Sequence, residues 1–248
     1  MPFPRLHALI PAAGTGSRVQ AQQPKQYLTL GDRAMVVHAI EALCADARIA
    51  QVLVVVAPAD PHIAALGLDR LAPRVSIAAV GGASRAASVR AGLDALAARG
   101  AAEDDWVLVH DAARPCLAAE ELAALIDALI DDTVGGLLAQ PLADTLKRAD
   151  RADGTGSAPR VQATVDRALL WRAATPQMFR QATLRRALDA PGMLARATDE
   201  ASAVEALGLA PRLIACGATN LKVTTAADVP LARAILQAQG RIGPQENP

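Results

Sequence analysis

Aromatic side chains and net charge are both scarce in this chain of 248 residues. Phe, Trp and Tyr together make up 2% of the sequence, too few for the stacked rings that bind single-stranded nucleic acid. The 25 Lys and Arg residues balance the 25 Asp and Glu residues, so the formal net charge is zero. This balance argues against broad binding to nucleic acid, but it is compatible with a small anion site.

Cysteines and long apolar runs are also few. Cys44, Cys116 and Cys216 lie far apart and form no Cys-x-x-Cys motif, which excludes a disulfide framework and a zinc ribbon and predicts buried thiols in a reducing compartment. No apolar run reaches the roughly 18 residues that a membrane span needs. The apolar stretch near the start is broken by Pro11 and is too short for a signal peptide. We therefore expect a cytoplasmic protein that makes no membrane contact.

Apolar residues, in contrast, are abundant. They make up 52% of the sequence, against 20% for charged residues, which is the composition of a globular protein with a buried core. We expect a single domain over residues 1–240 and a frayed tail over residues 241–248.

Two kinds of apolar pattern alternate along the chain. Short continuous runs, rich in β-branched residues, predict strands at residues 6–12, 51–57, 75–80, 106–110, 134–140 and 212–216. Apolar residues at helical spacing predict helices at residues 34–44, 84–98, 120–130, around 169–171, 181–188, 199–207 and 226–239. This alternation predicts an α/β fold, with right-handed βαβ units around a mostly parallel sheet flanked by helices. Ligands of such sheets bind at the carboxyl ends of the strands.

The alternation breaks at residues 142–165, which hold many charges, two glycines and a proline. A disordered linker and a protruding β-hairpin both fit this composition. We favour a hairpin arm, because the helices and the strand expected after it continue the same domain.

The loop after the first predicted strand reads PAAGTGSRVQAQQPKQYL over residues 11–28. Its small residues allow backbone N–H groups to approach an anion, and Arg18 and Lys25 could reach phosphate oxygens. The dinucleotide-binding motif is incomplete, because Val19 stands where a small residue is needed, and this disfavours a nicotinamide-dependent dehydrogenase. The Walker motif is absent. A simple turn with two solvated cations would also explain the pattern.

Asp111 and Arg114 follow the predicted strand at residues 106–110. A carboxylate at the end of a strand suits Mg²⁺, which prefers one or two carboxylates together with substrate phosphates, and Arg114 would then face an anionic substrate. The alternative is a helix-capping Asp paired with an Arg. We interpret His110 as a packed side chain rather than a catalytic base.

Two further loops carry polar groups. Gly81 and Gly82 offer backbone groups to a base or a ribose, with Ser88 one helical turn further on, although Ser84 could simply cap the helix. Residues 220–224, expected to end a strand, contain a possible phosphate cation, Lys222, and a possible metal ligand, Asn220. Four cations, one carboxylate and no catalytic triad favour a polyanionic substrate such as a nucleoside triphosphate. The four cations are Arg18, Lys25, Arg114 and Lys222.

Nine blocks, in this order, resemble the 2-C-methyl-D-erythritol 4-phosphate cytidylyltransferase family over nearly the whole chain. They read PAAGTGSR, PKQYL, GGASRAASV, VLVHDAARPC, PLADTLKR, TVDR, ATPQMF, TDEASAVE and NLKVTT. The resemblance implies a Rossmann-like fold of the nucleotidyltransferase type. It also implies transfer of CMP from CTP to methylerythritol phosphate, with Mg²⁺ or another divalent cation, in the non-mevalonate route to isoprenoids.

The resemblance also implies roles for individual residues. Those that act on the phosphates of CTP are Arg18, Lys25 and Lys222. Those that hold the cytosine and the ribose are Ala12, Ala13, Gly14, Thr15, Gly16, Gly81, Gly82 and Ser88. Those around the acceptor are Asp111, Arg114, Thr145, Lys147, Arg167 and Thr175. Asp111 is in addition the implied metal ligand, and residues 142–165 are the implied dimerisation arm, which helps to complete the partner's acceptor site.

The chain departs from the family pattern at two places. Ala218 and Thr219 stand where many relatives carry an acidic residue, which leaves Asn220 as the candidate second metal ligand. Ala83 and Ser84 replace acidic residues in the GGASR block, so contacts to the nucleotide there would use backbone groups or water.

Two alternative functions remain open. One is a sister cytidylyltransferase that acts on another polyol phosphate, such as ribitol 5-phosphate. The other is a non-catalytic nucleotide-binding protein with the same fold. The presence of Arg18, Lys25 and Asp111 together argues against the second alternative.

Overall fold

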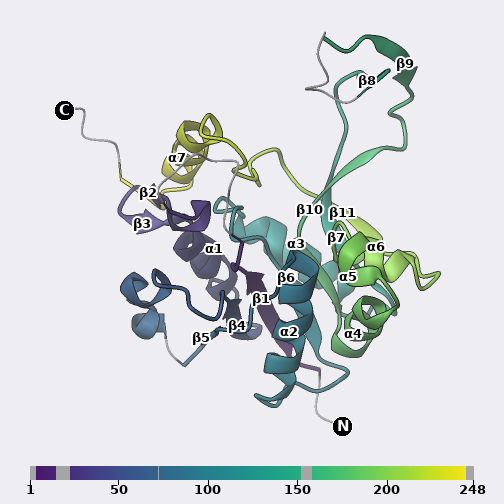
Figure 1. Ribbon diagram of the computed structural model, residues 1–248. Helices are drawn as coiled ribbons and strands as arrows, with labels where there is room; N and C mark the ends of the chain where they lie inside the picture. Colours follow the sequence, from purple (N-terminus) through teal and green to yellow (C-terminus); the bar gives the residue numbers. More distant parts are fainter. Residues whose placement is uncertain (1–3, 15–22, 72, 152–157, 244–248) are drawn as a thin grey trace.

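A seven-stranded sheet forms the centre of the protein (Figure 1). The computed structural model describes residues 4–14, 23–71, 73–151 and 158–243. The strands lie in the order β11–β7–β10–β6–β1–β4–β5, and β10 alone among them runs antiparallel to its neighbours. Their bounds are Leu6–Pro11 (β1), Ile49–Val55 (β4), Val75–Ala78 (β5), Trp106–Val109 (β6), Gly135–Pro141 (β7), Trp171–Arg180 (β10) and Arg212–Ala215 (β11). This is the mostly parallel α/β sheet that the sequence predicts.

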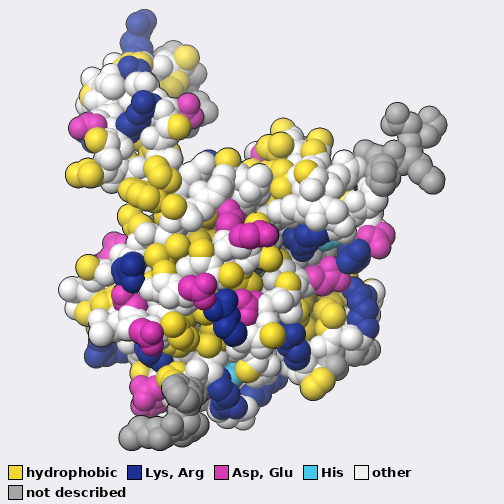
Figure 2. Space-filling model, turned by 180° about the vertical axis from the view of Figure 1, so that it is seen from behind, with side chains coloured by type: hydrophobic (Ala, Val, Ile, Leu, Met, Phe, Trp, Pro, Cys, Tyr) yellow, Lys and Arg dark blue, Asp and Glu magenta, His cyan; other side chains and the backbone are white. Residues whose placement is uncertain are grey.

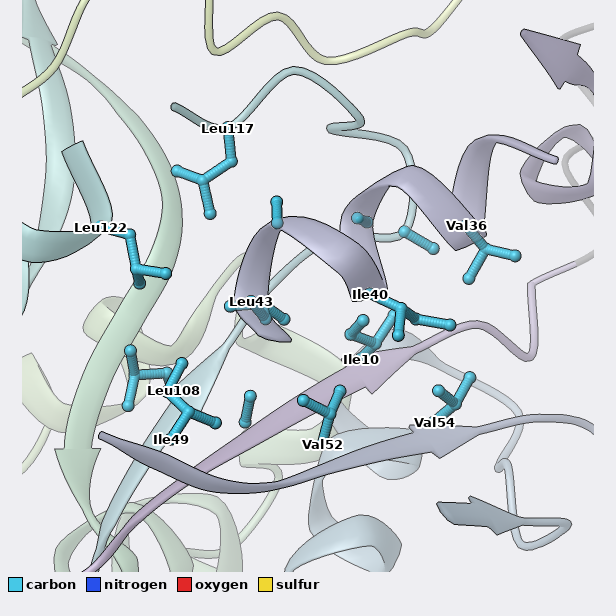
Figure 3. Close-up of a cluster of buried hydrophobic side chains, with 14 of the residues drawn as sticks. Ile10, Val36, Ile40, Leu43, Ile49, Val52, Val54, Leu108, Leu117 and Leu122 are labelled. Carbon is cyan, nitrogen blue, oxygen red and sulfur yellow. The ribbon is translucent and has the colours of Figure 1, made fainter. Parts of the chain in front are cut away.

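The strands read as continuous apolar runs because the sheet is covered on both faces. Ile10 of β1 packs into one cluster and Leu9 into another, since successive side chains of a strand point to opposite faces. Figure 3 shows the first cluster, in which Ile40 and Leu43 lie over β1 and β4.

Helices cover each face of the sheet. The first cluster is closed by α1 (Met35–Cys44) and α3 (Ala119–Leu129). The opposite face is covered by α2 (Arg85–Ala97), α4 (Gln181–Asp189), α5 (Met193–Arg196) and α6 (Glu200–Glu205). A smaller cluster joins α7 (Asp228–Ala238) to the two-stranded sheet of β2 (Thr29–Leu30) and β3 (Arg33–Ala34). The short 3-10 helices are η1 (Lys25–Tyr27), η2 (Ile63–Leu66) and η3 (Leu68–Leu71).

The helix predicted around residues 169–171 is wrong, because Trp171 begins the ten-residue strand β10. This strand fills the gap between β6 and β7, where Met178 pairs with Leu108 on one side and with Gly136 on the other. Backbone groups of both neighbours need a hydrogen-bond partner there, and this need outweighs the helical spacing of a short apolar run.

Two expectations for the C-terminal part also differ from the structure. Segment 220–224 does not end a strand, because it lies in a loop whose Val223 N–H donates to the carbonyl of Ala113 at 2.8 Å. The sequence assigns Arg241 to a frayed tail, yet its guanidinium donates to the carbonyl of Pro115 at 2.8 Å. Residues 244–248 of that tail lie outside the described residues.

Residues 142–165 contain two antiparallel strands, β8 (Leu146–Ala149) and β9 (Val161–Val165). Figure 1 shows this pair standing away from the central sheet, beyond the ends of β7 and β10. Figure 2 shows hydrophobic side chains gathered where the arm joins the body. In the described part of the chain, no helix is both long enough and apolar enough to cross a membrane.

Candidate active site

A cavity of about 530 Å³ opens at the carboxyl ends of β1, β5 and β6. Such a crevice forms in a parallel sheet where the connections that follow two neighbouring strands lead to opposite faces of the sheet. The strand order places this point beside β1. The residues that line it come from five separate segments of the chain. They are Pro11, Ala12, Ala13, Gly14, Lys25, Gln26, Gly82, Ala83, Ser84, Arg85, Ser88, Asp111, Ala112, Ala113 and Lys222.

The loop after β1 is held in shape by Gln26. The side-chain nitrogen of this buried residue donates to the carbonyls of Ala12 and Gly14, both at 2.8 Å. Gln26 was not among the predicted site residues, because a glutamine beside a glycine-containing loop has no distinctive local pattern. Thr15, Gly16 and Arg18 lie outside the described residues.

Lys25 lines the cavity from η1. Its ammonium group donates to the carbonyl of Val223 at 3.0 Å and so joins two segments that are 198 residues apart in the sequence. The structure thereby brings Lys25 and Lys222, both predicted to act on phosphates, to the same cavity.

The loop after β5 approaches the loop after β1 closely. A Cβ atom added to Gly81 would lie 2.2 Å from the Cβ of Ala13, so this position requires glycine. Ser84 caps α2, because its hydroxyl accepts from the N–H of Ala87 at 3.1 Å. The Ser88 hydroxyl accepts from Gly82 N–H at 3.1 Å. The backbone groups predicted to hold a nucleotide are therefore fixed by their own local hydrogen bonds.

Asp111 is the buried carboxylate at the end of β6. One carboxylate oxygen lies 2.8 Å from Nε of Arg85, and the other lies 2.7 Å from Nζ of Lys222. Nε of Arg114 lies 4.0 Å from the second oxygen. Burial alone would raise the pKa of Asp111, but the charges of Arg85 and Lys222 outweigh it and hold the pKa well below its usual range.

Arg85 connects Asp111 to a second buried carboxylate. Its two terminal nitrogens lie 2.6 and 3.0 Å from the two oxygens of Glu200, in the forked geometry typical of an ionised pair. Burial raises the pKa of Glu200, and the Arg85 guanidinium opposes this rise. Neither residue was singled out, although both lie in matching blocks (GGASR and TDEASAVE), because they are 115 positions apart.

His110 is a packed residue, as the sequence analysis interprets it. Its Nε2 lies 3.0 Å from the carbonyl of Arg114, which only accepts, so Nε2 carries the proton. Nδ1 then accepts from the hydroxyl of Thr175 at 3.0 Å, and that hydroxyl oxygen accepts from the N–H of Asp111. Burial lowers the pKa of His110 to about 4. Both ring nitrogens are committed, so His110 is not available as a general base.

The hydrogen bonds around His110 and Thr175 extend to Arg114 and Asn220. A guanidinium nitrogen of Arg114 donates to the Asn220 carbonyl at 2.6 Å, and the Asn220 side chain donates to the Thr175 carbonyl at 2.9 Å. Within the described residues, the side-chain oxygen of Asn220 is buried and has no hydrogen-bond partner.

The remaining candidate acceptor residues lie on the arm, outside the cavity of their own chain. Thr145, Lys147 and Arg167 are exposed there. The ammonium group of Lys147 donates to the hydroxyl of Thr164 at 2.7 Å, and the guanidinium of Arg167 donates to the carbonyl of Ala143. The structure therefore does not bring these three residues together with Asp111.

Comparison with known proteins assigns the chain to a family. A family model for 2-C-methyl-D-erythritol 4-phosphate cytidylyltransferase matches residues 6–238. The cytidylyltransferase of that name from Laribacter hongkongensis is 54% identical over 233 residues, which cover 94% of this chain and 96% of the relative. The one from Dechloromonas aromatica is 51% identical over 237 residues, which cover 96% of this chain and all of the relative.

Solved structures agree with this assignment and confirm the predicted fold class. The crystal structure of a 4-diphosphocytidyl-2C-methyl-D-erythritol synthase matches with a TM-score of 0.81 and 40% sequence identity, covering 95% of this chain and 100% of that chain. The 2-C-methyl-D-erythritol 4-phosphate cytidylyltransferase of Thermus thermophilus matches with a TM-score of 0.73 and 30% identity, covering 94% of this chain and 99% of that chain. This chain therefore belongs to the 2-C-methyl-D-erythritol 4-phosphate cytidylyltransferase family.

Proposed function

We propose that the cavity described above is where this enzyme transfers CMP from CTP to 2-C-methyl-D-erythritol 4-phosphate. The products are pyrophosphate and 4-diphosphocytidyl-2-C-methyl-D-erythritol, an intermediate of isoprenoid biosynthesis. The reaction is inferred from family membership. One observation supports its location: Lys25, Lys222 and Asp111 line the same cavity at the carboxyl ends of the strands.

The reaction is a single in-line displacement. A lone pair on a phosphate oxygen of the acceptor forms a bond to the α-phosphorus of CTP. The bond from that phosphorus to the bridging oxygen breaks, and pyrophosphate leaves with the electron pair. The acceptor phosphate is already ionised near neutral pH, so the enzyme contributes positioning and charge stabilisation rather than a strong base. Both ring nitrogens of His110 are hydrogen-bonded within the protein, which is consistent with a mechanism that needs no histidine base.

The cations of the cavity bind the triphosphate. Lys25 is held by the carbonyl of Val223, and Lys222 is held by the carboxylate of Asp111. Both side chains line the cavity. Lys222 is 41% exposed and can move from Asp111 to a phosphate oxygen. We assign Arg18 to the same task on the family pattern. The backbone around Gly14 and Gly82 binds the cytosine and the ribose.

A divalent cation, Mg²⁺ by the family pattern, would be held by Asp111 together with the substrate phosphates. No group of three or more His, Cys, Asp or Glu residues in the described part of the chain could hold a metal ion, so a site built from protein ligands alone does not fit. A single ionised carboxylate beside bound phosphates does fit, because Mg²⁺ often keeps only one or two protein ligands. Asn220, with its unpartnered buried oxygen, is the candidate second ligand. When bound, the cation neutralises charge on the phosphates.

The enzyme acts as a homodimer joined through residues 142–165. Exposed apolar side chains on the arm and just after it support this: Val161 of β9 is 65% exposed, and Leu169 is 89% exposed. The position of Lys147 and Arg167, away from the cavity of their own chain, supports a role in the partner's acceptor site. There they would join Arg114 and bind methylerythritol phosphate.

The test is an acceptor-specificity assay with CTP and Mg²⁺, read as release of pyrophosphate. We expect release with methylerythritol phosphate, release slower by about tenfold or more with ribitol 5-phosphate, and none without an acceptor. Faster release with ribitol 5-phosphate would favour the sister enzyme. A lack of release with every acceptor would favour a non-catalytic nucleotide-binding protein.

A further inference from the structure

Three positively charged side chains surround the carboxylate of Asp111. Arg85 and Lys222 contact its two oxygens, and Arg114 lies 4.0 Å from one of them. A divalent cation must compete with these groups for the carboxylate. The only other carboxylate recorded in contact with any of these cations, within the described residues, is that of Glu200.

The geometry ties Glu200 to one of these cations. Glu200 is 1% exposed, so it contributes little to the surface and much to the electrostatics of the interior. It engages both terminal nitrogens of Arg85 and leaves Nε for Asp111. The charge of the guanidinium is thus shared between two carboxylates, although burying three charged groups costs desolvation energy.

We propose that Glu200 is a positioning residue for the divalent cation. By neutralising Arg85, it leaves the negative charge of Asp111 available to the cation that accompanies the triphosphate. Glu200 itself touches neither the cation nor the substrate. The inference rests on the proposed role of Asp111 as the metal ligand.

The proposal predicts opposite effects on two binding events. Without the charge of Glu200, Arg85 holds Asp111 more strongly and repels a divalent cation. The same change makes the cavity more positive, which favours the bare triphosphate. A purely structural role for Glu200 would instead weaken the binding of CTP with and without metal.

The experiment measures the dissociation constant of CTP by calorimetry, with and without Mg²⁺ and without acceptor. For Glu200→Gln, we expect the factor by which Mg²⁺ tightens CTP binding to fall by about tenfold, while metal-free CTP binds no more weakly than to the wild type. The double variant Arg85→Gln/Glu200→Gln removes both charges, and the factor should return to within about threefold of the wild type.

Two further variants distinguish an error in the role of Glu200 from an error in the proposed metal site. Asp189→Asn removes one of the two ion pairs of Arg90, which also lies on α2 but does not line the cavity, and should leave the Mg²⁺ factor unchanged. Asp111→Asn should abolish the tightening of CTP binding by Mg²⁺. If Mg²⁺ still tightens CTP binding in this variant, the proposed metal site itself is wrong.

If Asp111→Asn abolishes the factor while Glu200→Gln leaves it intact, only the inference about Glu200 is overturned. Failure of the double variant to recover the factor would also overturn it. If thermal unfolding shows that Glu200→Gln does not fold, Arg85→Gln decides the question. That variant should keep or raise the Mg²⁺ factor, because it removes the competing cation, and a lower factor would contradict the proposal.

Discussion

Two lysines face the cavity in different states. Lys25 is hydrogen-bonded to a backbone carbonyl, whereas Lys222 is paired with the carboxylate of Asp111. The carboxylate of Asp111 cancels much of the charge of Lys222 until substrate arrives. Both lysines line the cavity, so both can meet an anion that enters it.

Lys25→Ala should lower kcat by at least about 100-fold, because the cavity loses a cation that we assign to the triphosphate. Thermal unfolding should change little, since the side chain lies at the cavity wall. Pyrophosphate release and calorimetry measure the two effects. We expect a loss of similar size for Arg18→Ala. Near-normal turnover in either variant would refute the assignment of that residue.

His38 gives the fold a pH dependence that is unrelated to catalysis. Its Nε2 donates to the carbonyl of Leu30 at 2.8 Å, and Nδ1 is buried without a partner among the described residues. Burial lowers the pKa of His38 below its ordinary value of 6.5, so the unfolded chain takes up a proton that the folded chain refuses. The free energy of unfolding therefore falls as the pH drops from about 6.5 toward the pKa of the folded state.

The replacement His38→Leu should remove this part of the pH dependence. The contribution of His38 to wild-type stability should fall by up to about 1.4 kcal/mol for each pH unit below 6.5. The variant keeps the contribution of His110, whose pKa is also lowered by burial, and should fall less steeply than the wild type, whatever its stability at pH 7.5. Urea unfolding at several pH values measures the slopes. Equal slopes would show that His38 titrates alike in the folded and unfolded chains.

At the scale of elements, the shape of the cavity depends on the close contact between the loop after β1 and the loop after β5. The loops after β1 and β5 touch at Ala13 and Gly81, and the N–H of Gly81 donates to the carbonyl of Val56 at 2.8 Å. Both loops were predicted correctly from the sequence, because strand ends can be read from local apolar runs. It missed β10, since Thr175, Pro176 and Gln177 interrupt the apolar pattern of that strand.

Gly81→Ala should raise the KM for CTP by at least about tenfold and lower the melting temperature. Its Cβ would lie 2.2 Å from Ala13 and 2.8 Å from the Val56 carbonyl, so the two loops must move apart. Gly14→Ala is the matched control for stability, because no described atom lies within 4 Å of the added Cβ. A melting temperature that falls equally in both variants would contradict this explanation.

At the scale of the whole molecule, the residues that we propose for the acceptor site are divided between the body and the arm. Asp111 and Arg114 belong to the body, whereas Lys147 and Arg167 lie on the arm. If the arm serves the partner subunit, each active site of a dimer combines Lys25 of one chain with Arg167 of the other. Arg167→Ala should then mainly raise the KM for the acceptor.

Mixing two impaired variants tests this division. Lys25→Ala and Arg167→Ala chains are unfolded and refolded together and assayed at low acceptor concentration. Half of the chains enter mixed dimers, in which one of the two sites is intact, so about a quarter of the wild-type activity should return. No gain over the separately refolded variants would show that Arg167 acts in its own subunit.

The sequence alone determined the fold class, most strands and helices, and the family. Apolar periodicity is a local property, and the motif blocks are contiguous, so both can be read without knowing which segments meet. The sequence also located Asp111 at the end of a strand and Lys25 in the segment that follows β1. It identified Lys222 as a candidate cation but placed it wrongly at the end of a strand.

Only the tertiary structure decided how these residues are held. The pair of Arg85 and Glu200, and the two bonds that Gln26 donates to the loop after β1, are made by buried polar side chains. Such contacts have no period along the chain, and their partners can be more than a hundred residues apart. They form because a buried polar group must find a hydrogen-bond partner, and the fold determines which one is within reach.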